Sequence, residues 1–168
     1  MAYYYYLEAE FGTSQAAAVA FAAHFKDFKF KLKNGLKISV FSNFQSQDEE
    51  GNWRCTIIPS GVSLGVPNRE YERLIESHEQ LEEITLTLYD HLESAPPFRY
   101  AHTQWEIEER LNWSELMSDR DSFSDPNQKW YDGLVLSDEI WKQAGSPPVF
   151  VPFAPGYLWR PYSGATYW

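Results

Sequence analysis

The segment that decides the fold is FKFKLKNGLKISV, residues 28–40. Apolar side chains alternate with lysines on both sides of an Asn-Gly pair, which indicates two half-buried strands joined by a tight turn. A two-residue turn would set the apolar face of each strand against the lysines of the other. A three-residue loop, residues 33–35 with Gly35 left-handed, pairs Leu32 with Leu36 instead and gathers the apolar side chains on one face. The sequence therefore predicts a bulged antiparallel hairpin.

A strand and a helix are predicted before this hairpin. Residues 3–11 alternate with the period of a half-buried strand. The second face of that strand carries polar and aromatic residues: Tyr4, Tyr6, Glu8 and Glu10. Residues 16–25 have the small apolar composition of a helix packed on a sheet, and Thr13 or Ser14 can cap its N-terminus.

Three further elements after the hairpin complete a β-α-β-β-β-α-β order. Residues 53–58 alternate and follow a polar turn, which predicts a second hairpin. A helical apolar stripe runs from Tyr71 to Leu92, with Asn68 as the predicted N-cap. Residues 98–107 alternate again as a strand. We predict an α+β fold: a two-layer sandwich with a mostly antiparallel sheet and two main helices on one face, ferredoxin-like or related.

The remaining residues, 111–168, are expected to form an extension packed on the 1–110 core within a single domain. Short helices are predicted at residues 112–118 and, with Ser137 as cap and Gly145 as stop, at residues 137–144. The Asp- and Ser-rich loop between them, residues 118–128, is predicted to be the most mobile part.

The tail, residues 149–168, is rich in proline, glycine and aromatic residues and is predicted to be irregular. Exposed tyrosine and tryptophan side chains are enriched at protein interfaces. The tail residues selected as binding candidates are Trp159, Tyr162 and Trp168. The alternative is that these rings pack onto the domain itself.

The charge balance points to a protein partner. The chain has 24 acidic and 14 basic residues, a net charge of -10, which opposes binding to a phosphate backbone and favours a basic protein surface. The acidic candidates for such a surface lie together on one predicted turn: Asp48, Glu49 and Glu50. The alternative is that the charge serves solubility alone.

Composition and motifs argue against several other classes. Cys55 is the only cysteine, so an intramolecular disulfide and a multi-cysteine metal site are excluded. The histidines lack metal-ligand spacing, and no phosphate-binding loop, Gly-x-Ser-x-Gly elbow or zinc helix occurs, so no metal or cofactor is expected. The apolar run at residues 16–23 is too short to span a bilayer and no secretory leader is recognised, so a cytoplasmic location is expected.

One strand face offers an enzymatic alternative. If residues 100–108 form a strand, His102, Gln104, Glu106 and Glu108 share a face that holds an acid and a base within reach of one ligand. The same row is also typical of a charged, solvent-facing strand edge. The leading expectation is therefore a non-enzymatic protein-binding domain of the immunity or inhibitor type, and the alternative is a small enzyme or ligand-binding protein using His102 and Glu106.

Overall fold

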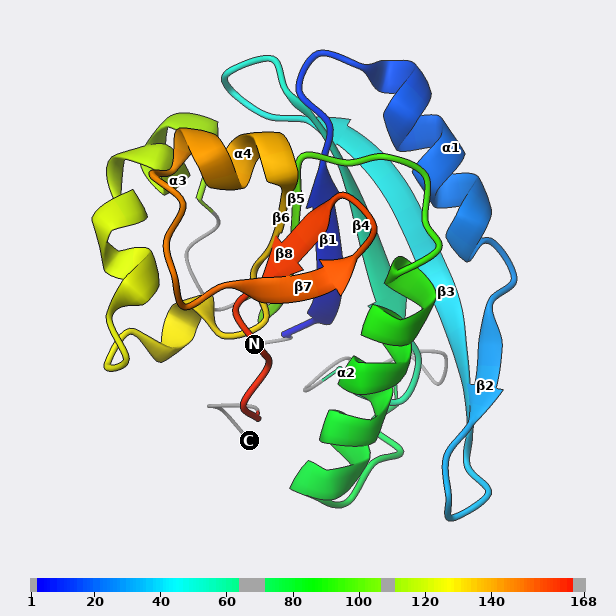
Figure 1. The fold of residues 1–168 in the computed structure, drawn as a ribbon. Helices are drawn as coiled ribbons and strands as arrows, with labels where there is room; N and C mark the ends of the chain where they lie inside the picture. Colours follow the sequence, from blue (N-terminus) through cyan, green and yellow to red (C-terminus); the bar gives the residue numbers. More distant parts are fainter. Residues whose placement is uncertain (1–2, 64–71, 107–110, 165–168) are drawn as a thin grey trace.

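The computed structural model describes residues 3–63, 72–106 and 111–164 and shows an α+β fold around one eight-stranded sheet (Figure 1). The strands are β1 (Tyr5–Glu10), β2 (Lys29–Lys31), β3 (Lys37–Gln47), β4 (Trp53–Pro59), β5 (Tyr100–Trp105), β6 (Val135–Ser137), β7 (Val151–Ala154) and β8 (Tyr157–Trp159). The helices are α1 (Gln15–Phe25), α2 (His78–Leu92), α3 (Trp113–Ser118) and α4 (Asp138–Gln143), with short 3-10 helices η2 (Arg120–Ser124) and η3 (Lys129–Tyr131). No helix in this part of the chain is long and apolar enough to cross a membrane.

The predicted bulged hairpin is confirmed. The backbone N–H of Leu32 donates to the carbonyl oxygen of Leu36 at 2.9 Å, and Phe30 stands opposite Ile38. Gly35 has a φ of 88°, in the left-handed region that glycine adopts at no steric cost. Leu32 and Ile38 are buried on one face of the hairpin, so the register follows the apolar pattern.

The two main helices begin where capping side chains allow it. Ser14, one of the two predicted caps, accepts from the N–H of Ala17 at the start of α1. Helix α2 begins later than predicted, because Ser77 and Gln80 form a capping box there and the residues from 72 to 76 are not helical. The predicted cap Asn68 lies outside the described residues.

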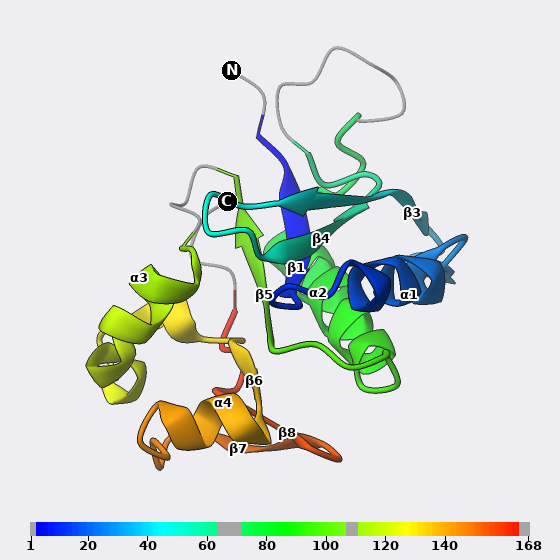
Figure 2. The same ribbon diagram turned by 90° about the horizontal axis from the view of Figure 1, so that it is seen from above.

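The sheet is curled, and different layers of helices cover its two faces (Figures 1 and 2). The strand order is β2-β3-β4-β1-β5-β6-β8-β7, and every neighbouring pair is antiparallel. Helices α1 and α2 pack on the inner face in one apolar cluster with β1 and β4, whereas α3, η2 and α4 cover the outer face of β5 and β6. The specific ferredoxin-like order is not confirmed, because the described sheet has eight strands, with β2 at one end and β6, β8 and β7 at the other.

The residues after 110 correct the sequence prediction twice. The tail is not irregular throughout: β7 and β8 form a hairpin around Gly156 and extend the sheet, with Pro152 on the edge strand, where a missing N–H is tolerated. The segment 118–128 is not a plain loop, because η2 inserts Phe123 into the outer apolar cluster. The two predicted short helices are confirmed as α3, capped by Asn112, and α4, capped by Ser137.

Candidate functional site

Polar side chains line the outer face of the three central strands. The alternation of β1 predicts a half-buried strand, but both of its faces are covered: Glu8 is 4% exposed and Glu10 is fully buried. Strand register sets Glu8 between Thr56 on β4 and His102 on β5. Because α3 and η2 bring residues 111–131 over this face, the carboxylates lie under a second layer that alternation in β1 alone does not reveal.

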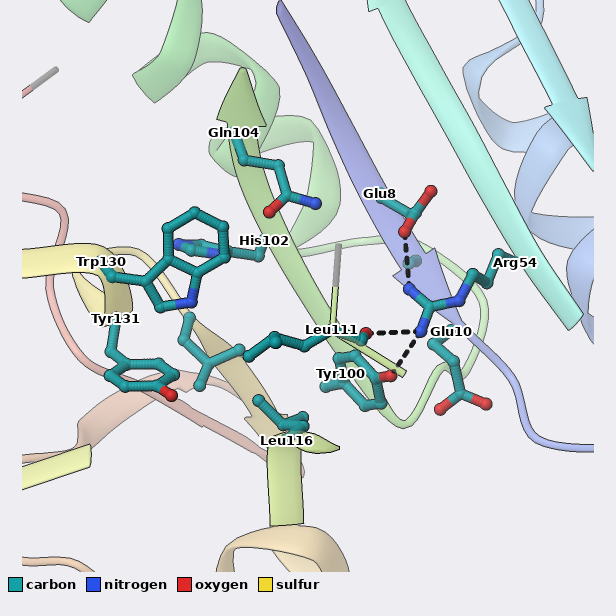
Figure 3. Close-up of a pocket in the computed structure, with 12 residues that line it drawn as sticks. Glu8, Glu10, Arg54, Tyr100, His102, Gln104, Leu111, Leu116, Trp130 and Tyr131 are labelled. Carbon is teal, nitrogen blue, oxygen red and sulfur yellow. Dashed lines mark hydrogen bonds and ion pairs between the residues drawn. The ribbon is translucent and has the colours of Figure 1, made fainter. Parts of the chain in front are cut away.

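Arg54 connects four parts of this layer (Figure 3). Its Nη1 donates to Glu8 Oε1 at 2.6 Å, and its Nη2 donates to the hydroxyl of Tyr100 at 3.1 Å and to the carbonyl oxygen of Leu111 at 2.7 Å. The second oxygen of Glu8 accepts from the hydroxyl of Thr56 at 2.9 Å. A buried ion pair needs such additional hydrogen bonds to offset desolvation, and both carboxylate oxygens of Glu8 are used in this way.

A second buried carboxylate is held in the same manner. Glu10 accepts two hydrogen bonds from Arg99, both 2.8 Å long, and a third from the backbone N–H of Gly12. The guanidinium of Arg99 stacks on the ring of Trp113 at 4.2 Å from its centroid. Arg99 therefore connects the start of α3 to β1, as Arg54 does through its contacts with Leu111 and Glu8.

The polar residues that are predicted to share one face of β5 do not all lie at the same site. His102 and Gln104 line a cavity of about 30 Å³ beside Glu8 and Trp130. Glu106 does not line it; its side chain is exposed and accepts from the backbone N–H of Tyr4 at 3.3 Å. Glu108 lies outside the described residues. The proposed pair of His102 and Glu106 therefore does not face one common cavity.

The cavity has room for water but not for a substrate. A water molecule needs roughly 10 to 15 Å³ of this kind of volume, whereas small-molecule sites span about 300 to 1,000 Å³. The ring nitrogen Nε2 of His102 lies 3.1 Å from the carbonyl oxygen of Asp132 and is occupied by that contact. Among the described residues no group of His, Cys, Asp and Glu side chains could hold a metal ion. The polar layer is thus organised as a buried network.

His102 makes stability depend on pH. Desolvation lowers its pKa from 6.5 to about 4, so the unfolded chain takes up the proton first. Stability then falls as the pH drops from about 6.5 to about 4, at roughly 1.4 kcal/mol per pH unit or about 3 kcal/mol in all. We expect His102→Gln to remove this part of the slope. Urea unfolding at several pH values tests it, and an unchanged slope in the variant would contradict the assignment.

The predicted acidic turn is engaged by its own protein. Asp48 accepts from Arg54 Nε at 3.2 Å and from the backbone N–H groups of Glu50 and Asn52, each at 2.9 Å. Glu50 accepts from the backbone N–H of Ser114 at 3.3 Å. Glu49 is exposed and makes no such contact with the described residues. The turn closes the β3–β4 hairpin onto α3 and leaves one carboxylate of the three for a partner.

The candidate aromatic side chains of the tail pack inward where they are described. The ring of Trp159 lies 5.2 Å from that of Tyr89 on α2, and the ring of Tyr162 lies 6.2 Å from it. Both are half-buried, so they join the inner apolar cluster. Trp168 lies outside the described residues.

An acidic helix face that the sequence reading did not select is exposed on α2. Five of its side chains recur at helical spacing and face solvent: Glu79, Glu82, Leu86, Asp90 and Glu93. Leu86 is 40% exposed at the centre of this stripe, and α2 contains no lysine or arginine. The pKa of Glu79 is lowered by hydrogen bonds from its own backbone N–H and from Ser77. We call these five residues the acidic face of α2. Their spacing opposite the buried stripe was the signal in the sequence.

Comparison with known proteins finds no relative of this chain. No protein-family model, no curated protein and no solved structure matches the chain.

Proposed function

We propose that the protein is a non-enzymatic binding domain that recognises a basic surface on another protein, in the manner of an immunity or inhibitor protein. The observation that carries this proposal is the acidic face of α2, four carboxylates around one exposed leucine on a helix without basic side chains other than histidine. An apolar centre within a polar rim is a common arrangement at specific interfaces.

The distribution of the other carboxylates supports this choice of surface. Glu8, Glu10, Asp48 and Asp132 are committed to arginine side chains of the same chain. The acidic face of α2 instead adds to a net charge of -10, which attracts a basic partner and raises its rate of encounter. The cavity beside His102 is too small to favour the enzymatic alternative.

Charge reversal on α2 tests the proposal. The wild type and the variant Glu79→Lys, Glu82→Lys, Asp90→Lys are immobilised side by side and exposed to lysate of the organism that makes the protein. Because these side chains are exposed on the solvent face of α2, the variant is expected to fold. We expect the wild type to retain a protein with a basic surface. The amount of this protein retained by the variant should be lower by about tenfold or more.

A matched control separates the surface from net charge. The variant Glu49→Lys, Asp121→Lys, Glu139→Lys makes the same change in total charge at exposed positions away from α2. It should retain the partner nearly as well as the wild type. Equal retention on all three proteins, or equal loss on both variants, would contradict recognition through the acidic face of α2.

A further inference from the structure

The strongest positive surface of this acidic protein lies on the β2–β3 hairpin. Five of the 14 basic residues fall within residues 26–37, and all five are exposed: Lys26, Lys29, Lys31, Lys33 and Lys37. The register of the hairpin sets Lys31 directly opposite Lys37 and Lys29 opposite Ser39. These four side chains therefore share the face opposite to buried Leu32 and Ile38.

Within residues 3–63, 72–106 and 111–164, no acidic side chain pairs with the lysines of this face. Like charges directly opposite each other on paired strands are destabilising. Among the described residues, Lys29, Lys31 and Lys37 form no ion pair. The same face borders an open groove of about 430 Å³, lined by the three lysines with Phe30, Ile38 and Ser39. The repulsive pair of Lys31 and Lys37 therefore lies beside a groove that has room for an anionic ligand.

The backbone edge beside the lysine face is open at Lys29 and Lys31 within the described part of the chain, whereas the N–H of Lys33 donates to Glu83 on α2 at 2.8 Å. Strand β2 is at the end of the sheet, to the right in Figure 1. On either side of β2, the carbonyl oxygen of Phe28 accepts from Val40 and the N–H of Leu32 donates to Leu36, so residues at even positions face β3. In an antiparallel pair the alternate residues direct their backbone groups the other way, so Lys29 and Lys31 present N–H and C=O groups outward. An edge of this kind can accept one more strand.

We propose that the edge of β2 binds an extended acidic segment of a partner protein, which adds to the sheet as a further strand. Backbone groups of Lys29 and Lys31 supply the hydrogen bonds, and carboxylates at alternate positions of the segment meet the lysine face. This surface is separate from the acidic face of α2 and does not depend on its function. Edge lysines also protect sheets from pairing with apolar strands, and an acidic segment is the kind of strand that they attract rather than repel.

A short fluorescein-labelled peptide that alternates glutamate with threonine provides the probe. Fluorescence anisotropy is measured with the full chain at about 150 mM salt, where long-range repulsion by the net charge is screened. We expect saturable binding of this peptide. The same peptide with N-methylated amides on the pairing edge keeps its charge but cannot join a sheet, so it should bind at least about fivefold more weakly.

The variant Lys31→Glu tests the residues without unfolding the hairpin. It sets an opposite charge against Lys37, so its melting temperature should be equal to or above that of the wild type. We nevertheless expect it to lose at least about fivefold in affinity for the peptide, whereas Lys142→Glu, which makes the same charge change on α4, should stay within about twofold. Three results would overturn the proposal: no binding of the glutamate peptide, equal binding of the N-methylated peptide, or unchanged affinity in Lys31→Glu.

Discussion

Replacing Arg54 with methionine is expected to cost about 3 to 5 kcal/mol of folding free energy, because it leaves the carboxylate of Glu8 buried without a counter-charge. The same change removes the donors to Tyr100 and to the carbonyl oxygen of Leu111, so α3 also loses a connection to the sheet. Urea unfolding measures the loss, and a lower midpoint with an unchanged dependence on urea would identify it as a change in stability.

Two further variants show whether the buried charge is the cause. The double variant Glu8→Gln, Arg54→Met removes both charges and keeps an acceptor for Thr56, so it should recover much of the lost stability. Lys142→Met breaks the exposed pair with Asp138 and should cost less than about 1 kcal/mol. If Arg54→Met costs no more than Lys142→Met, the network does not hold the outer layer in place.

Replacing Phe123 with alanine is expected to cost about 3 to 5 kcal/mol, because the ring is fully buried and its removal leaves a cavity. Phe123 packs against the rings of Tyr131, at 4.9 Å, and Phe150, at 6.1 Å, between the outer helices and the sheet. Its carbonyl oxygen accepts from Arg160, which also pairs with Asp132. The segment around it is therefore anchored from three sides.

Thermal unfolding of Phe123→Ala beside Val19→Ala tests this anchoring. Val19 lies on the outer side of α1 and is 51% exposed, so its truncation should change stability by less than about 0.5 kcal/mol. A comparably small effect for Phe123→Ala would mean that residues 118–128 behave as the polar loop that their composition indicates.

Local chemistry made the hairpin and several helix starts predictable. The lysine alternation and Gly35 determine the hairpin register, Ser14 marks the start of α1 in the inner layer, and Ser137 marks the start of α4 in the outer layer, because each signal depends on residues close together in the chain. The start of α2 was missed, since the apolar stripe continues before His78 while the capping box at Ser77 determines where the helix begins.

The outer layer was less predictable because its partners are distant in sequence. Glu8 and Arg54 are 46 residues apart, and nothing near either residue indicates the pairing. The alternation of β1 is the same for a strand with one exposed face and for a strand whose polar face is buried by a second layer. For the same reason the periodicity of β5 does not separate His102 from Glu106. The separation depends on contacts with other segments, with Asp132 for His102 and with Tyr4 for Glu106.

The association rate with the captured partner, followed by stopped flow as salt is raised, tests recognition through the acidic face of α2 most directly. Screening acts over a Debye length of roughly 10 Å at 0.1 M salt, so the rate should fall by about tenfold or more between about 50 and 500 mM while dissociation changes little. The variant Glu79→Lys, Glu82→Lys, Asp90→Lys should already be slow at low salt, and Glu49→Lys, Asp121→Lys, Glu139→Lys should not. A rate that is indifferent to salt and to the α2 reversals would contradict the proposal.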